Sequence, residues 1–191
     1  MEELSPCPWC LSSELYKSYH DQEWGRPVRE ETKMFEFLLL ETFQAGLSWI
    51  TVLNKREEFR KAFHSFDMHR VAAMTDREVA NLMQNAGIIR HEAKIRAAIS
   101  NAQMAINLKN EGSSLVDFFW SYVNHLPINN CITSTSQVPG STKLSEKISK
   151  DLKKRGFKFV GPTVIYAHMQ ATGMVNDHLT NCPQYAEMMK G

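Results

Sequence analysis

The alternation of apolar and polar residues that marks β-strands is missing from this chain, whereas signals that start and stop helices recur along almost all of it. Thr75 and Glu78 have the spacing of a capping box, and Ser114 and Asp117 repeat it. Gly156 is a natural helix stop. The predicted fold class is all-α, with a long surface loop over residues 126–142 and helices over 13–18, 30–45, 54–63, 67–73, 76–85, 91–110, 115–124, 143–155 and 162–172.

The predicted helix over residues 30–45 carries a carboxylate among apolar residues. At 100° per residue, Met34, Phe37, Leu38, Glu41 and Ala45 point in directions within about 60° of one another, so they share one face. Burial raises the pKa of a carboxyl group and costs stability unless the group has a partner, so a buried glutamate is a candidate for function. A glutamate at the rim of this face, or one paired with a buried donor, fits the same pattern, and spacing alone favours that interpretation.

The composition excludes several classes of protein. With 191 residues, 43% of them hydrophobic, the chain can bury a sizeable core and is expected to form a single domain over residues 1–191. The longest apolar stretch, around residues 37–40, is far shorter than a membrane span, and the first residues do not resemble a secretory signal. Four cysteines are too few for a disulfide-stapled secreted domain, so a cytoplasmic protein without membrane contact is expected.

The net charge of +1 conceals an uneven distribution. Residues 1–41 carry nine acidic and four basic side chains, a balance of −5, whereas residues 42–191 carry twelve acidic and eighteen basic ones, a balance of +6. A dense basic run of this kind can bind phosphates, although charge alone favours an ordinary solvated helix face. The run consists of Lys143, Lys147, Lys150, Lys153, Lys154, Arg155 and Lys158.

Cysteine and histidine residues gather near both ends of the chain. His178 and Cys182 have a spacing that places two ligands on one helical face or across one tight turn. Two further ligands from near the N-terminus would complete a closed, structural zinc site. Cys7 with Cys10 and Cys7 with His20 are both possible second pairs, and buried free cysteines would explain the same residues without a metal.

Aromatic residues surround these features. Trp9, Tyr16, Tyr19 and Trp24 lie within sixteen residues, and Trp49 lies eight residues after Glu41. Flat side chains beside a buried carboxylate can enclose a base that has been turned out of its duplex, although ordinary core packing is the common role of aromatic residues.

The segment Asn85–His91 separates two strongly predicted helices. A short glycine-containing hairpin directs the free N–H groups of the following helix outward, where they can bind an anion such as DNA phosphate. Lys94 and Arg96 follow in the first turns of that helix. Many hairpins between two helices have this pattern. The segment is therefore a candidate for phosphate binding, and the pattern alone does not establish that role.

Six stretches are long and unusual enough to identify a family: YHD (19–21) with EWG (23–25), QAGLSWITVL (44–53), AGIIRH (86–91), WSYVNH (120–125), KRGFKFVG (154–161) and VNDH (175–178). Over about residues 7–183 the chain resembles the bacterial 3-methyladenine DNA glycosylase I family, usually called TAG. The resemblance implies a helix-hairpin-helix fold, one bound structural Zn²⁺ per chain, and removal of 3-methyladenine from alkylated double-stranded DNA, leaving an abasic site.

The resemblance also implies roles for individual residues. The family's zinc ligands fall on Cys7, His20, His178 and Cys182, in segments of about 1–25 and 174–191, and Cys10 departs from the family pattern. The remaining positions form three groups. Glu41, which recognises the base, and Tyr19, which forms a hydrogen bond with it, are the expected catalytic residues. Trp49 is expected to stack on the base, with Trp9, Tyr16 and Trp24 as the pocket wall. For DNA binding, the resemblance implies Leu47 with Gly46 as an apolar wedge, and Gly87, Ile88, Arg90 and Lys94 at the hairpin.

The expected reaction is simple hydrolysis. Residues 93–110 contain no Asp or Glu, although many relatives in the wider superfamily place an Asp about twenty residues past the hairpin, and no hairpin lysine is placed to form a Schiff base. A monomeric, monofunctional hydrolase without lyase activity is expected. The rival interpretations are a zinc-stabilised DNA-binding module without catalysis and a glycosylase for bulkier or oxidised bases.

Overall fold

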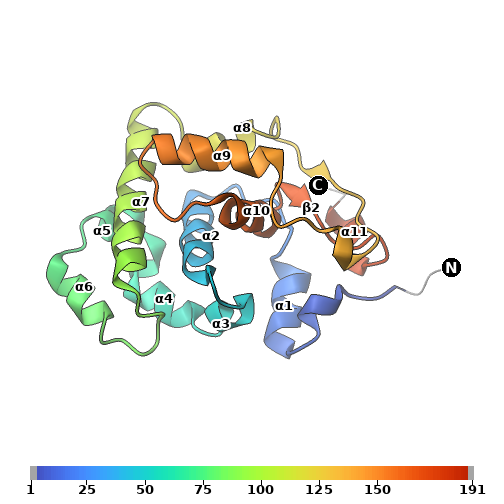
Figure 1. Ribbon diagram of the computed structural model, residues 1–191, viewed down its shortest axis with the longest axis horizontal. Coiled ribbons are helices and arrows are strands. Elements are labelled where there is room, and N and C mark those ends of the chain that lie inside the picture. The colour runs from blue at the N-terminus through green and yellow to red at the C-terminus, as the bar shows by residue number, and fades with distance from the viewer. Residues whose placement is uncertain (1–3, 189–191) are drawn as a thin grey trace.

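The computed structural model describes residues 4–188, which form eleven α-helices, three short 3-10 helices and two strands (Figure 1). The 3-10 helices are Pro8–Cys10, His64–Phe66 and Thr135–Gln137, and the strands are β1 (Ile128–Asn129) and β2 (Val175–Asn176). The α-helices are α1 (Glu14–Gln22), α2 (Glu31–Gln44), α3 (Trp49–Leu53), α4 (Arg56–Ala62), α5 (Met68–Ala72), α6 (Asp76–Leu82), α7 (Glu92–Asn110), α8 (Leu115–Ser121), α9 (Lys143–Lys154), α10 (Pro162–Ala171) and α11 (Pro183–Met188).

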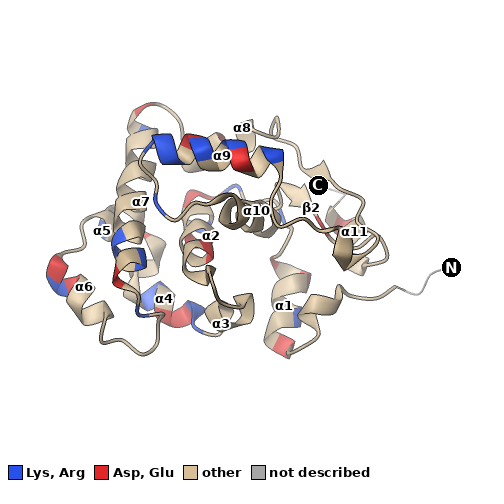
Figure 2. Ribbon diagram, viewed as in Figure 1, with Lys and Arg blue, Asp and Glu red and all other residues tan. Residues whose placement is uncertain are grey.

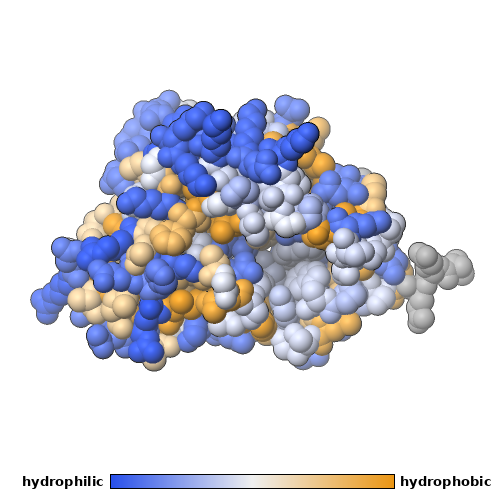
Figure 3. All heavy atoms as spheres, viewed as in Figure 1, coloured by the Kyte–Doolittle hydropathy of each residue, from blue (hydrophilic) through white to orange (hydrophobic). Residues whose placement is uncertain are grey.

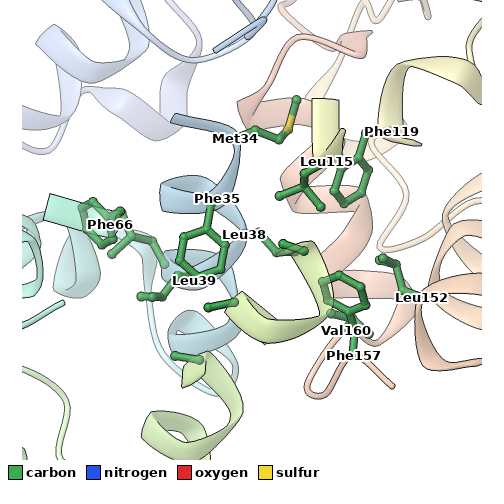
Figure 4. Close-up of a cluster of buried hydrophobic side chains, with 14 of the residues drawn as sticks. Met34, Phe35, Leu38, Leu39, Phe66, Leu115, Phe119, Leu152, Phe157 and Val160 are labelled. Atoms are coloured by element: carbon green, nitrogen blue, oxygen red, sulfur yellow. The ribbon is translucent and has the colours of Figure 1, made fainter. Parts of the chain in front are cut away.

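Helix α2 lies at the centre of the molecule, and the other long helices surround it (Figure 1). Every residue from 34 to 43 is buried, so this helix has no solvent-facing side along that stretch. It packs against α3, α7, α8 and α10, while α5 packs on α7 and α9 on α10. Figure 4 shows Phe35, Leu38 and Leu39 of α2 in the same apolar cluster as Phe157 and Val160, which follow α9. The central helix therefore joins the two halves of the core.

The nine predicted helices correspond to α1, α2 and α4–α10, and the structure confirms a mostly helical fold. Thr75 and Glu78 form the expected capping box, and Gly156 ends its helical segment with a positive φ of 94°. Ser114 accepts a hydrogen bond from the backbone N–H of Asp117 but does not form the reciprocal box. Helix α1 extends to Gln22, four residues beyond the predicted end, which places Tyr19 on its buried side.

The pattern analysis missed α3, α11 and the strand pair. The strands have two residues each, too short for an alternating pattern, and they pair in parallel with Ile128 opposite Val175. Strand β1 lies in the predicted loop 126–142, so its pairing with β2 anchors that segment. Helices α3 and α11 have five and six residues, a length at which tertiary packing rather than local propensity stabilises a helix.

The first and last described segments lie side by side (Figure 1). The Ser5 N–H donates to the Asn181 carbonyl oxygen over 3.1 Å. Gly173, which precedes β2, has a φ of +71°, and a Cβ atom there would lie 2.5 Å from the backbone of Arg26 and Pro27. A glycine is required at this contact because any side chain would collide with backbone.

None of the helices described between residues 4 and 188 combines the length and apolar character needed to cross a bilayer.

Candidate active site

A cavity of about 300 Å³ opens beside Glu41, and Figure 3 shows this face hollowed between α1, α3 and α10. Its volume is at the lower end of the range of small-molecule sites, about 300–1,000 Å³. The lining includes all six residues that the sequence assigned to the base pocket: Trp9, Tyr16, Tyr19, Trp24, Glu41 and Trp49.

Glu41 is the buried acid of this cavity. Its side chain comes from the last turns of α2, it is 3% exposed, and burial raises its pKa to about 8. Its Oε2 atom and the Nε1 atom of Trp49 are both buried without a hydrogen-bond partner in the described structure. The cavity therefore contains an unpaired acceptor and an unpaired donor, an arrangement that costs stability until a ligand satisfies it.

Aromatic rings form the walls around Glu41. The Tyr19 and Trp49 rings lie 5.5 Å apart between centroids, and Tyr19 is fully buried. Burial, with the nearby Glu41 charge as a smaller cause, raises the pKa of Tyr19 well above its usual value, so its hydroxyl stays protonated as a donor. Trp9 packs edge-on against Tyr16 at 4.9 Å and Trp24 at 5.0 Å.

An ion-pair network lies behind the α2 side of the cavity. Arg56 donates two hydrogen bonds of 2.8 Å to the Glu23 carboxylate and one of 2.7 Å to Glu36, whose side chain is buried. Burial opposes ionisation of Glu23, but hydrogen bonds from Arg56 and Lys33 outweigh it and lower its pKa to about 2. This network ties the end of α1 to α2 and α4. The EWG string contained Glu23, yet pattern analysis gave no signal for its partners.

Four potential metal ligands meet behind the aromatic wall. Cys7, His20, His178 and Cys182 are all buried, and their ligand atoms lie within 4.8 Å of one another. His178 Nδ1 lies 3.2 Å from His20 Nε2 and 3.7 Å from Cys182 Sγ, and Cys7 Sγ lies 3.8 Å from His178 Nδ1. Of the two alternatives that spacing left open, the structure brings His20 rather than Cys10 to Cys7.

The second ring nitrogens of both histidines have partners of their own. His20 Nδ1 lies 2.7 Å from the Asp21 carboxylate, and His178 Nε2 lies 3.1 Å from the Trp24 carbonyl oxygen. These contacts favour protons on the outer nitrogens and leave lone pairs on the nitrogens that face the cluster. The Cys10 thiol instead donates to the Cys7 carbonyl oxygen over 3.1 Å.

The four-residue cluster and the cavity share a wall. The Trp9 ring packs against the His20 ring with centroids 5.2 Å apart, and Trp24 packs against His178 at 4.7 Å. Both tryptophans also line the cavity. The side chains that enclose a ligand are therefore supported from behind by the residues that could hold a metal.

Asp177 and Gln170 are among the polar lining residues that the sequence analysis missed. Asp177 is buried, and its carboxylate accepts hydrogen bonds from Asn130 (2.6 Å), Tyr166 (2.6 Å) and Gln170 (2.8 Å). Gln170, on α10, is thereby held with its amide at the cavity. The VNDH string contained Asp177, but its partners are brought to it by the β1–β2 pairing and by α10, which no local pattern indicates.

The predicted wedge is exposed beside the cavity. Gly46 has a φ of +85° with open space around it, and the Leu47 side chain is 42% exposed. The loop follows directly from α2, which carries Glu41.

The hairpin between α6 and α7 differs from the prediction in its donors. The N–H groups of Gly87 and Ile88 donate within the hairpin to the side-chain and backbone oxygens of Asn85, over 2.8 and 3.3 Å, and Ile88 is buried. A Cβ at Gly87 would lie 2.9 Å from Asn85 and Glu58, so this glycine permits close packing. Arg90 is exposed and stays available for a phosphate.

Lys94 also has partners other than those predicted. Its side chain is 6% exposed, and its Nζ donates to the carbonyl oxygens of Phe43 (3.0 Å) and Ala45 (2.9 Å) at the end of α2. Burial lowers its pKa. Lys94 thus fixes the start of the Gly46–Leu47 loop rather than pointing at solvent.

Lys94→Met should lower the free energy of unfolding by about 1–3 kcal/mol, because the carbonyl groups of Phe43 and Ala45 lose their donor. It should leave the salt dependence of duplex binding unchanged. Urea unfolding and binding titrations at several salt concentrations measure both, with Arg96→Met as a control on the exposed side of α7. A log–log salt slope reduced by about one would instead make Lys94 a phosphate contact.

The lysine run lies on α9, where Figures 2 and 3 show a basic, hydrophilic ridge. Ile148 and Leu152 are buried on the opposite side of the helix, while Lys143, Lys147, Lys150 and Lys153 are exposed. This is the pattern of a solvated amphipathic helix.

Comparison with known proteins agrees with this site. The family model described as methyladenine glycosylase matches residues 9–185. DNA-3-methyladenine glycosylase 1 of Escherichia coli K12 is 52% identical over 182 residues, covering 95% of this chain and 97% of the relative. DNA-3-methyladenine glycosylase of Haemophilus influenzae is 49% identical over 177 residues, covering 93% and 96%.

Solved structures of such enzymes have the same fold. A crystal structure of 3-methyladenine DNA glycosylase I (TAG) matches with a TM-score of 0.92 at 50% identity, covering 94% of this chain and 98% of that one. The Staphylococcus aureus enzyme, solved to explain 3-methyladenine recognition, matches with a TM-score of 0.92 at 34% identity, covering 95% and 97%. These matches confirm the family predicted from the sequence: the chain belongs to the methyladenine glycosylase family.

Proposed function

We propose that this protein excises 3-methyladenine from double-stranded DNA by turning the base out of the duplex and hydrolysing its N-glycosidic bond, leaving an abasic site. One observation carries the proposal: an aromatic cavity of about 300 Å³ contains a buried acid and an indole N–H that lack partners. A flat base with polar edges would fill this space and satisfy both groups.

The charge of the substrate explains the acid. Methylation at N3 leaves the adenine of a nucleotide with a positive charge. Glu41, with a pKa of about 8, holds its proton at neutral pH while the cavity contains no cation. A cationic base beside it favours the ionised carboxylate, so Glu41 gives its proton to solvent water as the base enters, and an ion pair forms in the closed cavity.

Normal adenine is disfavoured at two stages. It is neutral, so it cannot form the ion pair with Glu41, and pairing and stacking hold it in the duplex. Trp49 would lie against the face of the bound base and the Tyr19 hydroxyl would reach its edge, with Trp9, Tyr16 and Trp24 excluding water from the remaining sides.

The reaction follows from the lability of the substrate. A cationic base is already a good leaving group, so extrusion, recognition and attack by water suffice. The described cavity lining contains no lysine, and the nearby Lys94 and Lys55 donate to backbone carbonyl oxygens. Without an amine to attack the sugar, a monofunctional glycosylase without lyase activity is the proposal.

One structural Zn²⁺ fits the cluster of Cys7, His20, His178 and Cys182. Tetrahedral zinc, with bonds of about 2.3 Å to sulfur and about 2.0 Å to nitrogen, places neighbouring ligand atoms about 3.3–3.8 Å apart, close to the spacings of this cluster. The ion would join the first and last segments of the fold and support the Trp9–Trp24 wall. Four protein ligands leave no open position, so its contribution is stability.

The DNA-binding face would combine the Gly46–Leu47 wedge with the 85–91 hairpin, where Arg90 is the exposed cation. We further propose that the protein has the helix-hairpin-helix fold, acts as a monomer and works in the cytoplasm of a bacterium.

Incubation with methylated duplex DNA and analysis of the released bases test the function. Release of 3-methyladenine without strand cleavage is expected. Release of bulkier or oxidised bases from suitably damaged DNA instead would identify a different glycosylase, and binding without release would identify a DNA-binding module.

Leu47→Ala should slow excision by about tenfold to a hundredfold, since burying a leucine side chain stabilises by about 1.5–3 kcal/mol and a wedge acts after docking. Affinity for undamaged duplex should stay near that of the wild type and fall as salt rises. Single-turnover excision and duplex titrations measure these effects, with the exposed Leu126→Ala as the control. Unchanged excision would remove Leu47 from the DNA-binding face.

A further inference from the structure

Phe159, in the connection between α9 and α10, combines two unusual properties. Its side chain is 41% exposed, and its backbone φ is 56°. Among residues 4–188, it is the one large apolar residue that is both exposed and in the left-handed region. A bulky residue is strained in that region, so this exposed ring is held in an unfavourable backbone conformation.

The neighbouring backbone explains how the strain is maintained. The buried Asn101 of α7 forms two hydrogen bonds with the Lys158 backbone, donating to its carbonyl oxygen (3.0 Å) and accepting from its N–H (2.8 Å). Ser149 donates to the Val160 carbonyl oxygen over 2.6 Å. Phe157 and Val160 are buried in the core (Figure 4). Residue 159 is therefore fixed from both sides with its ring turned out.

Contacts place this ring at the DNA-binding face. The Phe159 ring meets the ring of His91, the last hairpin residue and the N-cap of α7, with centroids 6.2 Å apart. The His91 side chain accepts a hydrogen bond from the Lys94 backbone N–H. The Lys94 side chain in turn donates to the carbonyl oxygen of Ala45, at the start of the Gly46–Leu47 loop. Figure 1 shows the α9–α10 connection running beside α7. Through these contacts, both the Gly46–Leu47 loop and Phe159 lie near the first turn of α7.

The surrounding charge suits a nucleic acid. Arg90 and Lys158 are exposed near the ring, and neither forms an ion pair within residues 4–188. An aromatic ring between unpaired cations matches a base flanked by phosphates.

We propose that Phe159 is a second base-contacting wedge, which stacks on a base of the duplex near the lesion while Leu47 fills the gap left by the extruded nucleotide. This inference rests on the proposed function. Two apolar contacts near the start of α7 would hold the duplex open at the lesion and bend it more effectively than one. The strained conformation is retained because it presents the ring.

Phe159→Gly tests the inference, because glycine adopts a positive φ without strain. Single-turnover excision from methylated duplex should slow by about tenfold, within the range expected for a lost base–aromatic stack. Affinity for free 3-methyladenine should match the wild type, and the midpoint of urea unfolding should not fall, because glycine relieves the strain at this position. Phe159→Tyr should restore excision, and Leu126→Ala should not alter it.

The salt dependence separates a wedge from a phosphate contact. Phe159→Gly should keep the wild-type salt slope for undamaged duplex, whereas Arg90→Ala should reduce it by about one. Wild-type excision rates in Phe159→Gly would overturn the inference. The inference would also be overturned if both Phe159→Gly and Phe159→Asn failed to fold or failed to bind the free base, since the ring would then have a structural role. A wild-type protein that releases no 3-methyladenine contradicts the proposed function instead.

Discussion

Glu41→Gln is expected to weaken binding of the cationic base and excision by about tenfold to a hundredfold while making the unliganded protein more stable. The loss reflects a charge-assisted hydrogen bond, worth about 1.5–3 kcal/mol. It stays incomplete because the positive charge of the lesion itself weakens the glycosidic bond. Excision rates on methylated DNA measure this loss. Titration with free 3-methyladenine, which is neutral because the electron pair of the broken glycosidic bond stays on its N9 atom, measures the hydrogen bonds to Glu41 without the ion pair.

The gain in stability should depend on pH. Burial raises the Glu41 pKa from 4.5 to about 8, so the folded wild type binds the proton more tightly than the unfolded chain. Its contribution to stability is fully present below pH 4.5 and is lost as pH rises through 8. The glutamine side chain does not titrate. Between pH 5 and pH 8, the free energy of unfolding of the variant should therefore rise by up to about 3 kcal/mol relative to that of the wild type.

Urea unfolding of both proteins at pH 5, 6.5 and 8 measures this difference, and taking the difference cancels titrations that the two proteins share. Glu146→Gln, at an exposed position on α9, is the matched control and should show no such trend. If Glu41→Gln follows the wild type in both binding and pH dependence, Glu41 is an ordinary structural acid and the pocket is misplaced.

Cys182→Ser should remove one ligand of the proposed Zn²⁺ site and lower the free energy of unfolding by several kcal/mol, because structural zinc sites contribute about 10–16 kcal/mol of binding energy that is coupled to folding. Excision should fall with it, since Trp9 and Trp24 lose the support of the histidine rings behind them. Elemental analysis of purified protein measures the metal content, and we expect one zinc per chain in the wild type. Urea unfolding measures the stability.

The other cysteines provide the controls. Cys10→Ser should keep the metal, because the Cys10 thiol donates to the Cys7 carbonyl oxygen, a bond that a serine hydroxyl can also form. Cys131→Ser, at an exposed position, should keep both metal and stability. A wild-type protein without metal, or a Cys10→Ser variant that loses it, would contradict the ligand set.

Local sequence patterns predicted what depends on one helix at a time. The face of α2 that carries Glu41 followed from residue spacing, because a helix fixes the direction of every side chain on it. Residue spacing could not show whether Glu41 has a hydrogen-bond partner. That depends on what surrounds Glu41 in space, namely Trp49 and residues of α10 and the β1–β2 pair. The fully buried stretch of α2 explains why Glu41 cannot reach the rim.

The family resemblance supplied the residues that local patterns left open, and the structure changed the interpretation of some of them. From the sequence, Lys94 was expected to be an exposed cation after a hairpin. Its side chain instead bonds to the start of the Gly46–Leu47 loop, because α7 starts beside the end of α2. Asp177 and the Glu23–Arg56 pair depend on contacts between distant segments, 33 positions apart for Glu23 and Arg56, which no window along the chain contains.

The contact between Cys7 and His178 spans 171 positions, so the pocket wall closes a loop that contains almost the whole domain. During synthesis, Trp9 and Trp24 are made early, but the histidine and cysteine that support them from the far end leave the ribosome after α2, α7 and α10. The helices from α2 to α10 all precede residue 172, so the helical core can form before then, whereas the supported aromatic wall of the cavity cannot. Closing so long a loop has an entropic cost that grows with the logarithm of its length. Completion of the pocket is therefore expected to be a late step in folding, and a chain stopped before residue 178 should be compact but unable to hold a base.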